Sequence, residues 1–346
     1  MTTIKDVAAR AGVGIGTVSR VINDHPSVTA DTRARVKDAI ATLDYHPSRV
    51  ARALSRQRSN SIAVVVPFFT HTSLTERVRG ILTGLADSPF ELVVFNVDHG
   101  GRRRERFARP TRRDLADGLL IVSITPSPEE SQRLHDSRIP TVVIDADTDG
   151  FPSFCVDDVT GGRMAAEHLI GLGHRRIGFI GDVDPGFGFT STPQRRVGLI
   201  QALAAIGEEL HPELDRVGPH GRAVARELAL EMLERPDRPT AIFAHSDTQA
   251  IGVLEASAQL GLDVPGDLSV IGFDDIEAAE LVGLTTVRQP LFESGRLAAV
   301  RLLELLDNGA PGESITTMLP LEIVDRRTTG PVAGVVRQAH PTDGPE

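Results

Sequence analysis

The stretch TIKDVAARAGVGIGTVSRVIN, residues 3–23, decides the fold of the N-terminal part of the chain. Its first apolar residues recur with the spacing of one helix face, namely Ile4, Val7, Ala8 and Ala11. Thr2 or Thr3 is suited to cap this helix, and Gly12 is suited to end it. A second apolar set follows at once and consists of Val13, Val18, Val21 and Ile22. Two short helices joined by a glycine-containing turn predict a helix-turn-helix, whose second helix lies in the major groove of DNA.

The residues that follow extend this unit into a small all-α head. A third helix is predicted from Ala30 to Leu43, with Thr29 as its cap, and the sequence YHP at residues 45–47 ends it. Residues 48–59, SRVARALSRQRS, then form a short helical pattern rich in alanine and arginine. We therefore expect a helix-turn-helix domain over residues 1–46 and a linker over residues 47–61.

From residue 62 the pattern changes to short apolar runs separated by helical patterns. The first series is SIAVVVP, FELVVFNV, DGLLIVSI and PTVVIDA, and the second is RRIGFIGD, PTAIFAHSD and DLSVIGFDD. Buried strands that alternate with helices predict parallel sheets covered on both faces. The length fits two doubly wound halves, each with roughly half a dozen strands. Because ligands bind outside the carboxyl ends of such strands, two facing halves predict a ligand cleft between them.

The charge of the chain is divided unevenly between these parts. The 346 residues suggest two or three domains and carry a net charge of −10. Residues 1–60 hold ten Lys and Arg against five Asp and Glu, whereas the remainder holds 27 against 42. Affinity for nucleic acid should therefore reside in the basic head and depend on salt.

Several classes of protein are disfavoured by features that the sequence lacks. It has no 18-residue apolar run and no charged-then-apolar N-terminal segment, so we expect no membrane partner and a cytoplasmic location. Cys155 is the only cysteine, which excludes a disulfide framework and a cysteine zinc site within one chain. The motifs GxxxxGK[ST], HExxH and GxSxG are missing, as is GxGxxG between a strand and a helix. We therefore expect no enzyme, no catalytic residue, no cofactor and no metal.

Six motifs, in this order and spacing, resemble the LacI/GalR family of transcriptional regulators. They are TIKDVAARAGV, TVSRVIN, YHPSRVARAL, GHRRIGFI, RPTAIFAHSD and VIGFDD, and the resemblance runs from about Thr3 to Thr329. It implies a homodimer that binds a pseudo-palindromic double-stranded DNA operator as a repressor. It also implies a small effector, typically a sugar or sugar derivative, in the cleft of the body. A sugar-transport binding protein is the alternative with a similar body, but the head argues against it.

The resemblance implies a body like that of periplasmic sugar-binding proteins, in which the chain crosses between the halves three times. We place these crossings near residues 157–162, 288–292 and 320–324. The ligand-binding and dimerisation domain is then expected over residues 62–330. Its N-terminal half would comprise 62–160 plus 291–321, and its C-terminal half 161–289 plus 322–330. The tail, residues 331–346, has too little apolar periodicity to order itself.

Candidate DNA contacts come from the second helix of the head and from the linker. They are Ile15, Gly16, Thr17, Ser19, Arg20, Asn23, Ser48, Arg49, Ala51 and Leu54. Arg20 can match guanine with its forked donors, whereas Ile15 can make only apolar contact and Gly16 offers no side chain. The linker resembles the family's hinge helix, in which Leu54 would wedge between base pairs in the minor groove. The alternative for Leu54 is packing on its own body.

Candidate ligand contacts lie at strand ends and in one loop. They are Ser73, Asp145, Phe187, Phe189, Arg195, Ser246, Asp247 and Asp274. Asp274 and Arg195 resemble the family's effector-binding acid and arginine, and the two phenylalanines could stack on a ring. The alternatives are a helix cap for Asp274, a surface position for Arg195 and loop packing for the phenylalanines. We interpret His174 as structural.

Overall fold

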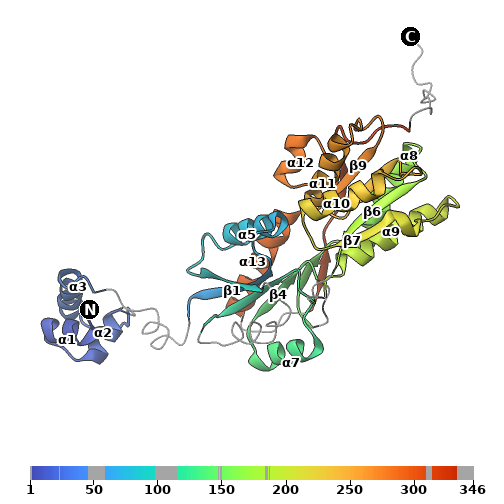
Figure 1. Ribbon diagram of the computed structural model, residues 1–346. Helices are drawn as coiled ribbons and strands as arrows, with labels where there is room; N and C mark the ends of the chain where they lie inside the picture. The colour runs from blue at the N-terminus through green and yellow to red at the C-terminus, as the bar shows by residue number, and fades with distance from the viewer. Residues whose placement is uncertain are drawn as a thin grey trace, which may run out of the picture.

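The computed structural model describes residues 2–22, 24–45, 59–97, 115–146, 148, 150–183, 186, 188–308 and 314–332. They form a helical head and a body that contains two sheets, each flanked by helices (Figure 1). No described helix combines the length and the apolar character that crossing a membrane requires.

The head consists of three helices, as predicted, α1 (Ile4–Ala11), α2 (Ile15–Ile22) and α3 (Ala30–Thr42). Thr3 caps α1 in a capping box with Asp6, and Gly12 ends the helix with a left-handed φ of 65°. The Thr29 side chain accepts a hydrogen bond from the backbone N–H of Thr32 and so caps α3. The helices share one buried core, made of Val7, Ala8, Ala11, Val18, Val21, Val36, Ala39 and Tyr45. The head is therefore a unit with its own core.

The body contains two six-stranded sheets. In the first half the order is β11-β5-β4-β3-β1-β2, with β1 (Ser61–Pro67), β2 (Glu91–Val97), β3 (Gly118–Val122), β4 (Thr141–Ile144), β5 (Ser153–Cys155) and β11 (Thr316–Met318). In the second half it is β12-β10-β9-β8-β6-β7, with β6 (Ile177–Asp182), β7 (Asp215–Gly218), β8 (Ala241–Ala244), β9 (Ser269–Asp274), β10 (Thr285–Arg288) and β12 (Glu322–Val324). The described strand pairs are parallel except β10 with β12. This confirms the predicted fold class, with one antiparallel strand added at an edge.

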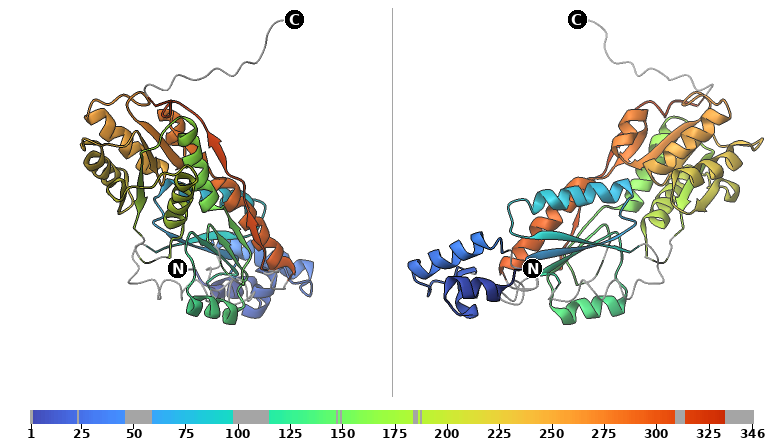
Figure 2. Two further views of the ribbon diagram at one scale, coloured as in Figure 1. Left: turned by 90° about the vertical axis from the view of Figure 1, so that its right-hand side faces the viewer. Right: turned by 60° about the vertical axis from the view of Figure 1, so that its left-hand side comes forward.

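Helices cover both faces of each sheet (Figure 2). The first half has α5 (Thr72–Gly84), α7 (Pro128–Ser137) and α13 (Leu291–Asn308). The second has α8 (Asp158–Gly171), α9 (Ser191–Ala205), η2 (Pro212–Leu214), α10 (Arg222–Leu233), α11 (Asp247–Gln259) and α12 (Glu277–Val282). In β1, Ile62 and Val64 face the core under α5 and α13, while Ala63 and Val65 face the core under α7. Successive side chains enter opposite cores, which is why this strand reads as a continuous apolar run.

The chain passes between the halves at three places. It leaves β5 at Cys155 and enters α8 at Asp158; it leaves β10 at Arg288 and enters α13 at Leu291. The third passage joins β11 to β12 over residues 319–321. The first passage therefore lies a few residues before the expected boundary at residue 160. The wider division of the chain into domains stays a prediction.

Several helix pairs touch at glycine, and two of these contacts involve arginines of the space between the halves. A β-carbon on Gly295 of α13 would overlap the backbone carbonyl of Arg77 in α5, and one on Gly162 of α8 would overlap the carbonyl of Arg195 in α9. Only glycine permits so close an approach between two helix backbones. These contacts fix the backbone of two arginines whose side chains point to the space between the halves.

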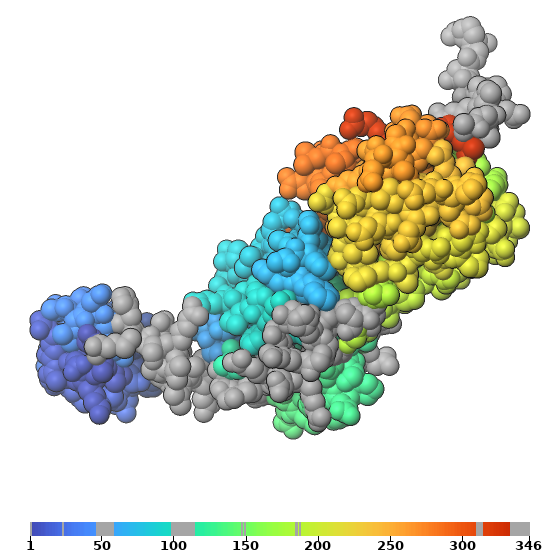
Figure 3. Space-filling view, in the orientation of Figure 1, coloured from blue at the N-terminus to red at the C-terminus, as the bar shows by residue number. Residues whose placement is uncertain are grey.

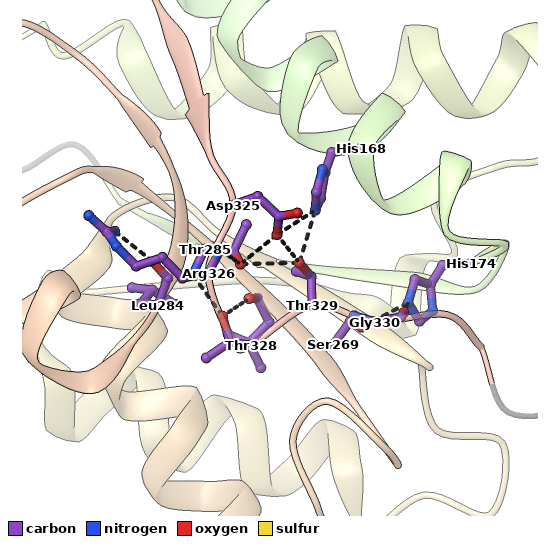
Figure 4. Close-up of polar contacts among 11 residues, drawn as sticks. His168, His174, Ser269, Leu284, Thr285, Asp325, Arg326, Thr328, Thr329 and Gly330 are labelled. Carbon is purple, nitrogen blue, oxygen red and sulfur yellow. Dashed lines mark hydrogen bonds and ion pairs between the residues drawn. The ribbon is translucent and has the colours of Figure 1, made fainter. Parts of the chain in front are cut away.

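The last described segment is hydrogen-bonded to the second half (Figure 4). The His174 ring lies within 2.9 Å of the Ser269 hydroxyl and 3.0 Å of the Gly330 carbonyl, and His168 lies 2.9 Å from the Thr329 hydroxyl. The N–H of Val332 donates to Leu172. His174 is thus a structural residue. The tail predicted to be disordered began at residue 331; its first two residues are described here, and residues 333–346 lie outside the described part.

Substituting Gly162 tests the helix contact. Gly162→Ala should lower the free energy of unfolding by about 1–3 kcal/mol, because α8 and α9 must separate. Gly171→Ala in the same helix is the matched control, since its β-carbon meets nothing within 4 Å. The control should be neutral or stabilising by up to about 1 kcal/mol. Urea unfolding measures both, and equal midpoints for the two variants would contradict the packing argument.

The buried histidines predict acid sensitivity. Burial lowers the pKa of His174 and of His168 from the usual 6.5. Their neutral forms therefore stabilise the fold fully above about pH 6.5, and this contribution is lost as the pH falls below that value. His174→Gln should unfold more easily at pH 7.5, by about 1–3 kcal/mol, but lose less stability between pH 7 and 5 than the wild type. The exposed His25→Gln is the control, and an unchanged pH slope in His174→Gln would refute the assignment.

Candidate functional site

The N-terminal part of α2, where the sequence predicts contacts with DNA, is exposed. Ile15 is 44% exposed, Gly16 and Arg20 are exposed, and a β-carbon at Gly16 would meet nothing within 4 Å. Val18 and Val21 on the other side of the helix are buried in the head. Helix α2 thus packs on the core of the head by one face. It carries five of the contacts predicted from the sequence, namely Ile15, Gly16, Thr17, Ser19 and Arg20. The remaining candidates, Asn23, Ser48, Arg49, Ala51 and Leu54, lie outside the described residues.

The turn between α2 and α3 is fixed by an arginine that contacts its own head. One Arg33 nitrogen lies 2.6 Å from the Asp24 carboxylate, and another donates to the carbonyl of His25 at 2.8 Å. Arg33 therefore joins the turn after α2 to helix α3.

A cavity of about 410 Å³ lies between the halves of the body. Its wall includes the residues that end or follow parallel strands of both sheets, namely Pro67, Ser123, Asp145, Asp182, His245 and Asp274. This is where the carboxyl ends of the two sheets face each other, as expected for a ligand site in this architecture. In the space-filling view the cyan-to-green surface of the first half meets the yellow-to-orange surface of the second (Figure 3).

Most of the predicted ligand contacts line this cavity. They are Ser73, Asp145, Phe189, Arg195, Ser246 and Asp274. Phe187 lies outside the described residues. Neither Asp274 nor Asp275 caps α12, whose N-cap is Ile276.

Asp247 does not line the cavity, and its prediction as a ligand contact is contradicted. It is fully buried, and its carboxylate accepts hydrogen bonds from the Thr286 hydroxyl at 2.6 Å and from the N–H of Ile276 at 2.9 Å. The reason is its position as the first residue of α11, which turns the side chain beneath the sheet. Asp247 therefore joins α11 to the segments around it.

A chain of buried and half-buried polar groups runs from one half to the other. Ser123 donates to Asp145 at 2.6 Å, and Asp145 pairs with Arg77 at 2.9 Å. Arg77 donates to the Gln289 side chain at 3.0 Å, and the Gln289 amide donates to Asp274 at 2.5 Å. Gln289 lies in the passage between β10 and α13. The chain of contacts thus begins in the first half, passes through a crossing segment and ends in the second half.

Arg195 is held on three sides. Its Nε donates to Asp158 at 2.7 Å, one terminal nitrogen donates to the carbonyl of His245 at 2.7 Å, and its guanidinium lies 3.5 Å from the centre of the Phe273 ring. The side chain is 3% exposed, so the alternative of a surface arginine is wrong. Its donors are presented to the cavity in a fixed orientation.

Aromatic rings from both halves meet at the cavity wall. Phe68 stacks on His71 with centroids 5.1 Å apart, and His71 lies 4.4 Å from His220 of the other half. Burial and the neighbouring His220 lower the pKa of His71 to about 4. Burial also lowers the pKa of His220, but the hydrogen bond to Asp182 and its charge outweigh this and raise it above the usual value. At neutral pH, His71 is therefore uncharged, whereas the neighbouring His220 retains its proton more readily than an ordinary histidine.

Comparisons with known proteins agree with both parts of this arrangement. Residues 3–48 match the family described as bacterial regulatory proteins, lacI family, and residues 166–329 match a periplasmic binding protein-like domain. The transcriptional regulator DegA of Bacillus subtilis (strain 168) is 32% identical over 96% of this chain and 99% of its own. The ribose operon repressor of Escherichia coli (strain K12) is 35% identical over 86% of this chain and 91% of its own. The chain belongs to the lacI family of bacterial regulatory proteins.

The solved structures include a Lac repressor dimer bound to operator and the anti-inducer ONPF. It is 27% identical, covers 95% of this chain and 99% of its own, and has a TM-score of 0.80. The relatives are regulators of transcription and not enzymes. This lacI-family chain is accordingly a DNA-binding transcriptional regulator.

Sequence reasoning missed several groups in this lacI-family site. Asp182 and His245 follow strands, so the rule that ligands bind at carboxyl ends could have identified them. Arg77 lies in an ordinary helix and Gln289 in a crossing segment, and neither carries a local signal. Among the described residues, no group of three or more His, Cys, Asp or Glu is arranged to hold a metal ion.

Gln289→Leu tests the polar chain in the lacI-family body. The substitution leaves Arg77 and Asp274 without their shared partner, so the free energy of unfolding should fall by about 1–3 kcal/mol. Gln132→Leu is the control, because this exposed glutamine bonds only to Asp136 of its own helix among the described contacts. Urea unfolding measures the free energy of unfolding of both variants. A decrease in Gln289→Leu no larger than that in the control would show that the chain of contacts does not stabilise the fold.

Proposed function

We propose that this protein is a homodimeric cytoplasmic repressor whose affinity for a pseudo-palindromic operator is set by a sugar or sugar derivative. The observation that carries the proposal is the cavity of about 410 Å³ whose wall combines side chains from both halves of the body. A ligand that touches both halves favours one arrangement of them over another, as a regulator requires.

The chemistry of the wall supports a polyhydroxylated ligand. Asp274 offers an acceptor and Arg195 offers donors, while Ser73 and Ser246 add hydroxyl groups. The stacked rings of the first half supply an apolar surface for the face of a sugar ring. The name of the ribose operon repressor agrees with a sugar as the effector class.

The exposed end of α2 supports DNA reading by the head. Arg20 would read a guanine edge, and Ile15 would contact a thymine methyl group. Gly16 contributes no side chain, so this head would read fewer base edges than most relatives. The basic charge of residues 1–60 supplies phosphate attraction. The linker candidates, Ser48, Arg49, Ala51 and Leu54, would contact the minor groove.

A link between cavity and linker is visible where the linker joins the body. The N–H and the hydroxyl of Ser59 each donate to the Asp117 carboxylate at 3.1 Å. Asp117 directly precedes β3, and Ser123 at the other end of β3 begins the polar chain around the cavity. A shift of the first half against the second would therefore move the base of the linker.

Exposed apolar side chains support assembly into a dimer. Leu82 of α5 is 53% exposed, Val94 of the edge strand β2 is 38% exposed, and Leu281 of α12 is 77% exposed. Helices α5 and α12 lie on the same side of the body in the right-hand view of Figure 2. Exposed apolar side chains on these elements would be available for contact with a second copy of the chain. The Lac repressor structure is itself a dimer on operator DNA.

Melting of the purified protein against sugars, nucleosides and purines tests the proposal. A ligand at 100 times its dissociation constant adds about 2.7 kcal/mol to the stability of the folded state. Operator DNA selected from a random library then reports the change in affinity. In Asp274→Ala the ligand response should be lost while operator binding without ligand survives, and the exposed Asp136→Ala should behave as wild type. A normal response in Asp274→Ala would remove the cavity from the mechanism.

A further inference from the structure

The arginines of the cavity are neutralised by the protein itself. Arg77 pairs with Asp145 at 2.9 Å, and Arg195 pairs with Asp158 at 2.7 Å. Both arginine side chains are almost completely buried; Asp145 lines the cavity, and Asp158 is buried next to Arg195. Neither arginine therefore offers the cavity an uncompensated positive charge.

The described histidines of the cavity wall add no uncompensated positive charge either. His220 lies 2.9 Å from a carboxylate oxygen of Asp182, so any proton that it carries is balanced. The pKa of His71 is lowered to about 4 and that of His245 to about 3, mainly by burial. Both rings are uncharged at neutral pH.

One carboxylate of the wall, Asp274, forms no ion pair of its own with the described residues, although the charges of Arg195 and Arg77 act on it from a distance. Asp274 lines the cavity, is 8% exposed and accepts a hydrogen bond from the neutral amide of Gln289. Within the described residues no ion pair satisfies it. Among the described residues of the wall, the excess side-chain charge is therefore negative.

Two helix N-termini at the cavity favour a negatively charged ligand, and so oppose the effect of Asp274. Ser73 in the first turn of α5 and Ser191 at the start of α9 both line the cavity, and helix N-termini favour anions. Each end carries at most about half an elementary charge, and its effect is weakened by solvent. Burial raises the pKa of Asp274, but the charge of the ionised carboxylate exceeds these partial charges for a ligand that must lie against it.

We infer that the effector is uncharged: a free sugar or nucleoside, and not a phosphorylated or carboxylated one. This inference rests on the proposed function and adds the charge of the ligand to it. A phosphate placed in the cavity would either face Asp274 or separate an existing pair and leave a buried carboxylate alone. Hydroxyl groups can donate to Asp274 and accept from Arg195 without disturbing any pair.

Matched pairs of compounds test this inference on the full chain. The pairs are D-ribose with ribose 5-phosphate, D-glucose with glucose 6-phosphate, and adenosine with adenosine monophosphate. Melting at constant ionic strength identifies binders, and calorimetric titration gives their dissociation constants. For every parent compound that binds, phosphorylation should weaken binding by about tenfold or more, since like charges then face each other.

A charge-removing variant supplies an independent reading. In Asp274→Asn the difference in affinity between the members of a binding pair should shrink, because the opposing charge is gone. The control Asp136→Asn removes one carboxylate from the exposed face of α7 and should leave the difference unchanged.

The outcomes separate this inference from the proposed function. A phosphorylated member that stabilises the wild type more than its parent overturns the inference while leaving a sugar-responsive regulator in place. If no compound of either kind binds, the sugar assignment of the proposed function fails, and the inference that rests on it fails with it. An unchanged difference in Asp274→Asn contradicts the role given to that carboxylate.

Discussion

Contact between helix backbones at glycine determines where the charges of the cavity lie. The backbone of Arg77 packs against Gly295 of α13, and the backbone of Arg195 packs against Gly162 of α8. The two contacts occur in different halves and produce the same result, an arginine projected from a rigid helix pair toward a carboxylate at the cleft. A side chain on either glycine would push the helices apart, and a shift of about 1 Å is enough to spoil a buried hydrogen bond.

The ion pairs that result set geometry more than stability. Taking charges out of water costs about as much as their attraction returns, so such pairs are weak evidence for a stable fold. Their effect here is to orient donors and acceptors before a ligand arrives. Gln289, located in a crossing segment, joins the pair in one half to Asp274 in the other. A ligand that hydrogen-bonds to Asp274 therefore contacts a chain of polar groups that connects both halves.

The sequence predicted Asp145, Arg195 and Asp274 at the cleft because parallel strands deliver their last residues to one edge and because the motifs resemble a known family. The same reasoning failed for Asp247, which also follows a strand. The first turn of α11 directs that carboxylate to Thr286 and Ile276 and away from the cavity. Strand-end position thus identifies the edge of the sheet, but the local helix geometry decides which way a side chain points.

What the sequence by itself determined is local or periodic. Capping of the first helix by a threonine, the left-handed stop at Gly12, the helix-turn-helix and the apolar runs that become buried strands all follow from neighbours a few residues apart. What only the tertiary structure decided is which distant groups meet. Arg77 and Gln289 are 212 positions apart in the chain and hydrogen-bonded in the fold. No spacing encodes such a contact, because it depends on how two sheets, closed by three passages of the chain, bring their carboxyl ends together.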